Sequence, residues 1–185
     1  VAGLGQEGGF GEAASWARWT LDMFDRGEVS EGTRRLRVIN DLGVARILTG
    51  DLVGLRRILE DAQVMAEGSL PMLAALLRST LAWLELAEQR PRAALDLISA
   101  TYQASSRSWR ARQGYQLVRC HIELGQLPEA ERVAADISKL ATADEPYEQA
   151  LAALARGMVA AVRGEDGATD DLQAALLSPN LVAEQ

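Results

Sequence analysis

Reactive and metal-binding side chains are scarce in this chain of 185 residues, which contains one cysteine and one histidine. Cys120 has no partner for an internal disulfide, which is typical of a reducing, cytoplasmic setting. Cys120 and His121 are neighbours on a predicted helix, so their side chains point about 100° apart and cannot readily hold one metal ion. We expect a buried Cys120, a half-exposed His121, no metal, no cofactor and no enzymatic activity.

Long apolar runs and an excess of positive charge are also absent. No apolar stretch approaches the roughly 20 residues that cross a bilayer, so we expect no membrane partner. The chain has 26 acidic and 19 basic residues and a formal net charge of −7. Such a chain repels a phosphate backbone, which argues against direct binding of nucleic acid. No stretch shows sustained alternation of period two, so no sheet is predicted.

The chain does contain a recurring helical hairpin, best seen at residues 41–62. One apolar stripe holds Leu42, Ala45, Leu48 and Thr49, and a second holds Leu52, Leu55, Leu59 and Ala62; between them, Gly50 predicts a helix stop and Asp51 a helix N-cap. Similar turns fall at Gly8, Gly50, Gln89, Gly125 and Gly164, at intervals of 42, 39, 36 and 39 residues. A period of this size predicts an all-α fold of stacked helix pairs.

We predict one repeat domain over residues 1–185, with about four and a half units. The units are a partial one at 1–26 and full ones at 32–68, 70–103, 105–141 and 144–177. The first full unit has predicted helices at 32–49 and 52–67. Pro71 and Pro91 suit first helical turns, because the missing N–H of proline is unpaired there anyway. An array that starts in mid-repeat is typical of a segment of a longer chain.

The spacing resembles the tetratricopeptide repeat, in which a Leu-Gly pair, a turn glycine, an aromatic residue and a small residue mark the helix seam. The corresponding residues here are Leu42-Gly43, Gly50, Leu52 and Leu55; Leu81-Ala82, Gln89, Pro91 and Ala94; Leu117-Val118, Gly125, Leu127 and Ala130; Gly157 and Gly164; and Gly8, Phe10 and Ala13 in the partial unit. The resemblance implies a right-handed solenoid of antiparallel helix pairs. It also implies a non-enzymatic module for protein–protein recognition.

Degenerate repeats near 39 residues also resemble the C-terminal arrays of large bacterial transcriptional regulators of the maltose-regulator and antibiotic-regulatory-protein types. That resemblance implies a sensor or partner-docking part of such a regulator, with DNA binding and ATP hydrolysis elsewhere in the polypeptide. An assembly scaffold is the first alternative, and an enzyme is a second, less favoured one.

In repeats of the resembled type, the first helix of each pair lines the concave surface. By this register, a set of positions on those helices is predicted to form a ligand or partner groove. These positions are Arg37, Asn40, Val44, Ser79, Trp83, Arg112, Tyr115 and Arg119. Guanidinium groups beside aromatic rings suit an acidic peptide, or a small effector that carries a carboxylate or phosphate. The alternative is that Trp83 and Tyr115 pack between helices and that the arginines are only solvated.

Three further tryptophans are predicted to pack at the seams between helices or at the ends of the array. Trp16 and Trp19 lie on the first predicted helix, where an upstream helix would dock. An exposed aromatic patch there would favour a homodimer through the repeat ends. Trp109 is likewise predicted to pack at a seam or at an end of the array.

Two other motifs are given structural interpretations. The stretch Gly3-Leu4-Gly5-Gln6-Glu7-Gly8 fits the dinucleotide fingerprint by its letters, but no predicted strand precedes it, so we interpret it as a turn. The acidic pairs Glu145/Glu148, Glu165/Asp166 and Asp170/Asp171 lie at helix starts or in turns, where carboxylates stabilise the first turn of a helix. Neither motif predicts catalysis.

Overall fold

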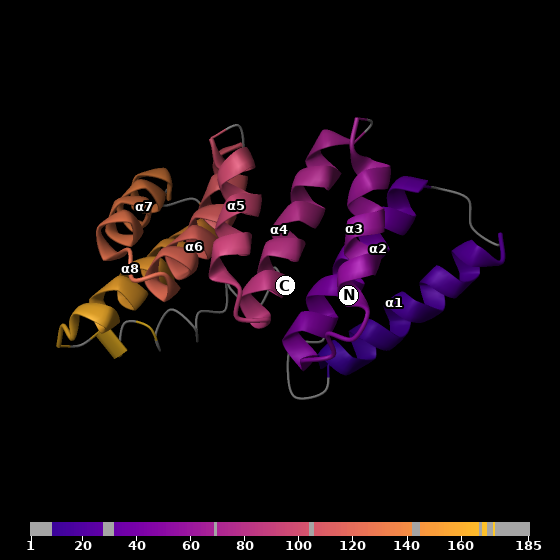
Figure 1. The fold of residues 1–185 in the computed structure, drawn as a ribbon, viewed down its shortest axis with the longest axis horizontal. Helices are drawn as coiled ribbons and strands as arrows, with labels where there is room; N and C mark the ends of the chain where they lie inside the picture. Colours follow the sequence, from indigo (N-terminus) through magenta and orange to yellow (C-terminus); the bar gives the residue numbers. More distant parts are fainter. Residues whose placement is uncertain are drawn as a thin grey trace. The chain divides into compact units, whose positions relative to one another are not determined.

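The computed structural model describes residues 9–27, 32–68, 70–103, 106–141, 145–166, 168–169 and 172, and these residues are helices joined by short turns (Figure 1). The helices are α1 (Gly9–Asp25), α2 (Gly32–Thr49), α3 (Leu55–Ala66), α4 (Pro71–Ala87), α5 (Pro91–Tyr102), α6 (Arg107–Glu123), α7 (Leu127–Leu140) and α8 (Pro146–Arg163). Within these ranges the chain forms no strand, which confirms the all-α prediction. Two compact units divide the chain at Gln89, so that one contains α1–α4 and the other α5–α8.

The turns predicted within the helix pairs are confirmed wherever the structure describes them. Gly50, Gly125 and Gly164 have φ values of 74°, 70° and 70°, in the left-handed region that glycine adopts without steric cost. Gln89 takes the same role with φ 60°, although its Cβ makes that conformation less favourable. Gly8, the fifth predicted turn, lies outside the described residues. Local chemistry therefore sets these helix ends.

Most helix starts also follow the sequence, but one prediction is wrong. Pro71, Pro91 and Pro146 each open a helix, as expected of a residue without an N–H group. Helix α3, however, begins at Leu55 rather than at residue 52, and its N-cap is Gly54 with φ 71°. Asp51 is therefore not the N-cap, because its carboxylate is bound by the side chain of Arg46 instead.

In the first unit, α2 packs against α1, α3 and α4. Alanines of α1 meet α2 in a cluster formed by Ala13, Ala14, Ala17, Leu42 and Ala45. On another side of α2, a Cβ added to Gly43 would lie 2.9 Å from Leu59 Cδ2 and 3.0 Å from Thr80 Cγ2. A glycine at this position lets α2 approach both α3 and α4 closely. The predicted seam role of Gly43 is thus supported by its contacts.

The last turn of α2 departs from the predicted apolar stripe. Leu42 and Ala45 are buried, as predicted, but Leu48 and Thr49 are exposed. The end of α2 lies beside the loop at 50–54, because α3 starts three residues later than predicted. A loop covers less of the neighbouring helix than a helical turn does.

In the second unit, α6 packs against α5, α7 and α8, and α7 also packs against α8. Helix α6 approaches α7 closely at Gly114, where an added Cβ would lie 2.6 Å from Ile137 Cγ1 on α7. Gly157 of α8 is the predicted seam residue of the fourth unit, and Leu172 packs against it. Most of the predicted second helix of that unit, including Asp170 and Asp171, lies outside the described residues.

Candidate functional site

One face of α6 carries three of the predicted groove residues. Arg112, Tyr115 and Arg119 follow one another at steps of three and four residues, which places them on the same side of the helix. All three are partly buried. Helix α8 packs beside α6, and its first turn contributes Tyr147. We name the five residues Trp109, Arg112, Tyr115, Arg119 and Tyr147 the inner-face cluster.

Arg112 lies between two aromatic rings of this cluster. Its guanidinium carbon is 4.5 Å from the centroid of the Tyr147 ring and 5.7 Å from the centroid of the Trp109 ring. A guanidinium above a ring face is attracted by the negative centre of the ring, and the two contacts restrict the long arginine side chain. A guanidinium is the side-chain group that recognises a carboxylate through paired N–H donors, so Arg112 brings this chemistry to the cluster.

Tyr115 and Arg119 extend the inner-face cluster along α6. The Tyr115 hydroxyl is protonated at neutral pH, as in any tyrosine, and burial raises its pKa further, so it can act as a hydrogen-bond donor. Arg119 Nη2 donates to Glu123 Oε1 at 3.3 Å, one turn further along the same helix. A partly exposed pair of this spacing is worth only a few tenths of a kcal/mol, so a ligand carboxylate can compete for Arg119.

Sequence reasoning missed two members of the inner-face cluster. For Trp109 the sequence predicts packing at seams or ends, and for Tyr147 it predicts no role. Trp109 precedes Arg112 by three residues on the same helix, and that spacing is a usable signal. Tyr147 is 35 positions away from Arg112 in sequence, so only the packing of α8 against α6 brings the two together.

The predicted groove residues of the first unit divide into two groups. Asn40 and Ser79 are buried, and the Thr80 hydroxyl of α4 donates to Asn40 Oδ1 of α2 at 2.7 Å. Both residues therefore sit among packed helices, where a partner would not reach them. Arg37 is exposed, and Val44 and Trp83 are partly buried. Of the predicted groove residues in this unit, only Arg37, Val44 and Trp83 are accessible to a partner.

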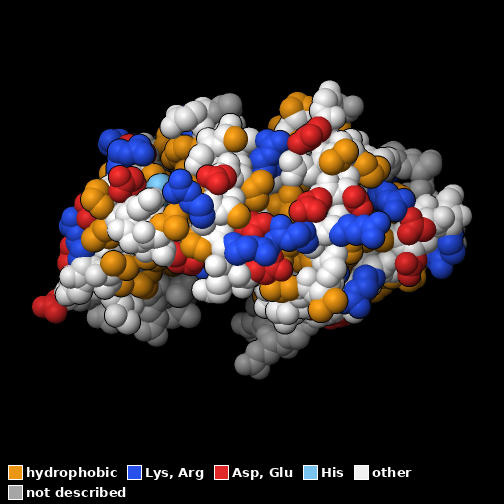
Figure 2. Space-filling model, viewed as in Figure 1, with side chains coloured by type: hydrophobic (Ala, Val, Ile, Leu, Met, Phe, Trp, Pro, Cys, Tyr) orange, Lys and Arg blue, Asp and Glu red, His pale blue; other side chains and the backbone are white. Residues whose placement is uncertain are grey.

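On the described part of the face shown in Figure 2, acidic and basic side chains are interspersed. Many of the arginines belong to ion pairs within the fold. Arg56 of α3, for example, reaches Glu85 of α4 at 2.5 Å and Glu88 at 2.6 Å. Such arginines hold neighbouring helices together, so charge alone does not identify a binding surface here.

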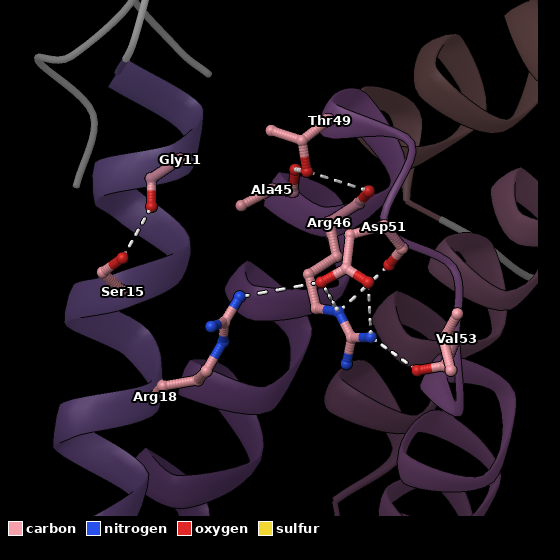
Figure 3. Close-up of polar contacts among 8 residues, drawn as sticks. All are labelled: Gly11, Ser15, Arg18, Ala45, Arg46, Thr49, Asp51 and Val53. Atoms are coloured by element: carbon pink, nitrogen blue, oxygen red, sulfur yellow. Dashed lines mark hydrogen bonds and ion pairs between the residues drawn. The ribbon is translucent and has the colours of Figure 1, made fainter.

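Arg46 holds the turn between α2 and α3 (Figure 3). Its side chain is 10% exposed, and its Nε donates to both the carboxylate and the carbonyl of Asp51 at 3.0 Å. Its Nη2 donates to the Val53 carbonyl at 2.6 Å and to Asp51 Oδ1 at 3.2 Å. Arg18 of α1 also reaches Asp51, at 3.6 Å. This network stabilises an irregular loop and leaves little of Arg46 for a ligand.

An open hollow of about 980 Å³ lies along α7 and α8, lined mainly by alanines. Its charged residues already have partners, since Arg156 donates to the Ser138 hydroxyl at 2.9 Å and Arg163 pairs with Glu131 and Glu165. Small side chains beside Gly157, where Leu172 packs, are typical of a surface for helix packing. We therefore do not assign a ligand to this hollow.

Cys120 and His121, the residues considered for metal binding or nucleophilic catalysis, lie in surroundings that favour a structural role. Cys120 is buried, and burial raises the pKa of its thiol to about 12. His121 is partly buried, and its Nδ1 lies 2.8 Å from Gln126 Oε1. Over the described ranges, no group of three His, Cys, Asp or Glu residues is placed to hold a metal ion. The Gly3–Gly8 motif lies outside the described residues.

The aromatic pair of α1 is on the surface. Trp16 and Trp19 are 53% and 51% exposed, and their rings meet edge to face with centroids 5.4 Å apart. Exposed tryptophans in contact with each other form an apolar patch of the kind found at interfaces. Among the helices described, none is long and apolar enough to cross a bilayer.

Comparison with known proteins gives one match. Residues 85–154 match the family model of the tetratricopeptide repeat. The matched stretch contains α5, α6 and α7 and ends within α8, so it includes the whole inner-face cluster. No curated protein and no solved structure matches the chain. The match and the all-helical fold together support a tetratricopeptide-like helical array, and tetratricopeptide repeats generally mediate protein–protein interaction.

Proposed function

We propose that this chain is the sensor or partner-docking module of a larger cytoplasmic transcriptional regulator of the bacterial type. In this role it catalyses no reaction, and it binds an acidic protein segment, or a small acidic effector, at the inner-face cluster. The tetratricopeptide match supports the general role of a binding module. The repeat spacing of 36–42 residues is the feature that favours a regulator.

The observation that carries the proposal is the stacking of Arg112 on Tyr147 and Trp109, with Tyr115 and Arg119 on the same face of α6. Two guanidiniums and three rings make a surface that combines bidentate recognition of carboxylates with apolar contact area. Because the rings already hold Arg112, less side-chain entropy is lost when a ligand binds. This arrangement favours a short segment that carries both carboxylates and apolar side chains.

The proposal can be tested with a peptide array in which Asp- and Glu-containing segments are paired with their Asn and Gln analogues. We expect the acidic members to bind and the neutral analogues to bind at least about tenfold more weakly, since each lost charged contact is worth about 1.5–3 kcal/mol. The double variant Arg112→Ala/Arg119→Ala should lose binding. Arg132→Ala, on the exposed side of α7, removes one such charge elsewhere and serves as the control for the single variants Arg112→Ala and Arg119→Ala.

Arg112→Lys separates stacking from charge alone, because lysine keeps the charge but lacks the planar group. We expect Arg112→Lys to bind nearly as weakly as Arg112→Ala. Equal binding by the wild type and the double variant, with unchanged helicity, would refute the proposed site.

A second candidate function is an assembly scaffold, and the exposed Trp16–Trp19 pair favours it. A scaffold would self-associate in a manner that survives Arg112→Ala/Arg119→Ala. It would lose self-association when Trp16 and Trp19 are replaced by serine. Analytical ultracentrifugation of these two double variants distinguishes the functions.

A further inference from the structure

The outer face of α1 carries a regular stripe that continues one residue beyond the helix. Its members are Glu12, Trp16, Trp19, Met23 and Arg26, at steps of four, three, four and three residues. The Arg26 N–H donates to the Asp22 carbonyl at 3.0 Å, so the helical course extends to the last member. This spacing of 3.5 residues on average is the repeat by which two helices pair along a seam.

This stripe lies on the side of α1 away from its packing partner. The opposite side packs on α2 through Ala13, Ala14 and Ala17. Along the stripe, Glu12, Trp16, Trp19 and Arg26 are exposed and Met23 is partly buried. A surface helix of a globular protein normally places charged or polar residues there. The stripe therefore has the pattern of a helix that pairs on both of its sides.

The charges of the stripe select the partner and its direction. Glu12 lies seven residues before Trp19 and Arg26 lies seven residues after it. Two such helices in antiparallel order, related by a twofold axis at Trp19, bring each Glu12 opposite Arg26 of the other copy. The same pairing places Trp16 within one residue of Met23 of the other copy, close enough for a favourable contact between sulfur and an aromatic ring. A parallel pairing would instead oppose like charges at both ends.

We propose that a second copy of this chain binds to the outer face of α1, forming an antiparallel α1–α1 dimer centred on Trp19. This dimer rests on the proposed scaffold function and specifies which helices of the two copies meet and in which direction they run. A twofold interface must be self-complementary. The stripe meets this requirement because it has a negative charge, Glu12, at one end and a positive charge, Arg26, at the other.

The size of the stripe implies a weak dimer. About half of each indole is exposed, so each of the four tryptophans offers roughly 100 Å². The resulting apolar area of roughly 400 Å² is well below the 1,200–2,000 Å² typical of stable interfaces. We expect dimers at high concentration that dissociate on dilution.

Sedimentation velocity of the 185-residue chain from about 1 µM to about 1 mM tests the pairing, a range that spans weak and moderate affinities. The wild type should pass from monomer to dimer. Glu12→Arg and Arg26→Glu should each weaken dimerisation at least about tenfold, because each places like charges at both ends of the seam. The exchange Glu12→Arg/Arg26→Glu should restore it.

Arg57→Glu serves as the matched control, since Arg57 is an exposed residue of α3. It should dimerise as the wild type does, and circular dichroism of every variant checks that α1 stays folded. A wild type that is monomeric throughout overturns both the dimer and the scaffold. Loss of dimers in Trp16→Ser/Trp19→Ser, with full dimerisation in both charge variants, would keep the scaffold but overturn the antiparallel register.

Discussion

Replacing Gly114 with alanine tests the close approach of α6 and α7. The new Cβ would lie 2.6 Å from Ile137 Cγ1, 2.8 Å from Ile137 Cδ1 and 3.4 Å from the Tyr102 hydroxyl. Carbon atoms prefer separations of about 3.5–4.0 Å, so either α7 or Ile137 must move by about 1 Å. Ile137 is completely buried, so its close-packed neighbours limit how far it can move.

Two opposing effects set the magnitude. Overpacking of this kind costs about 1–3 kcal/mol. Alanine also favours the helix over glycine by about 1 kcal/mol. We therefore expect Gly114→Ala to lower the free energy of unfolding by up to about 2 kcal/mol. Gly11→Ala, where an added Cβ meets no atom within 4 Å, should show only the favourable effect.

The sign of the effect should reverse in an Ile137→Ala background. Ile137→Ala alone costs about 2–5 kcal/mol, because it leaves a cavity. In that background the clash is gone, and Gly114→Ala should stabilise the protein by up to about 1 kcal/mol. Urea unfolding followed by circular dichroism measures all four members of the cycle. If Gly114→Ala stabilises the wild type as much as Gly11→Ala does, the close approach of α6 and α7 is incorrect.

Three further predictions concern a turn, an ion pair and the thiol. Gln89→Gly should raise the free energy of unfolding by about 0.5–1 kcal/mol in urea titrations, because glycine adopts the left-handed φ of 60° without a Cβ clash; no gain would argue against that turn. Arg46→Met should cost about 1–3 kcal/mol in the same assay, because the Asp51 carboxylate and the Val53 carbonyl lose their donor, and Arg46→Lys should not restore it. With its pKa raised from 9.0 to about 12, Cys120 has about a thousandfold less thiolate, so a disulfide reagent should label it only on unfolding; rapid labelling of the native protein would contradict its burial.

The repeat architecture could be predicted because its signals are local. A turn residue with positive φ, a proline in the first helical turn and an apolar period near 3.6 act within a few positions of one another. Gly50, Gln89 and Gly125 were identified in this way, and each ends a helix. The sequence register also placed Arg112, Tyr115 and Arg119 on one helical face, because that relation depends on spacing alone.

The start of α3 could not be predicted in the same way. Asp51 has the chemistry of an N-cap, but Arg46 binds its carboxylate and Gly54 takes the cap position instead. An arginine from the preceding helix thus occupies the carboxylate that would otherwise cap α3. The burial of Asn40 has a comparable cause, because its partner Thr80 belongs to a helix 40 positions away.

By itself, the sequence determined that this protein is an array of helix pairs, where most of its helices begin and end, and which side chains share one face of a helix. Those properties follow from backbone conformation and from the helical period, which act over a few residues. The tertiary structure decided that Arg112 stacks on Tyr147, that Asn40 is buried and that Trp16 and Trp19 are exposed. These outcomes depend on which helix packs on which, and that is set by contacts between residues far apart in the chain.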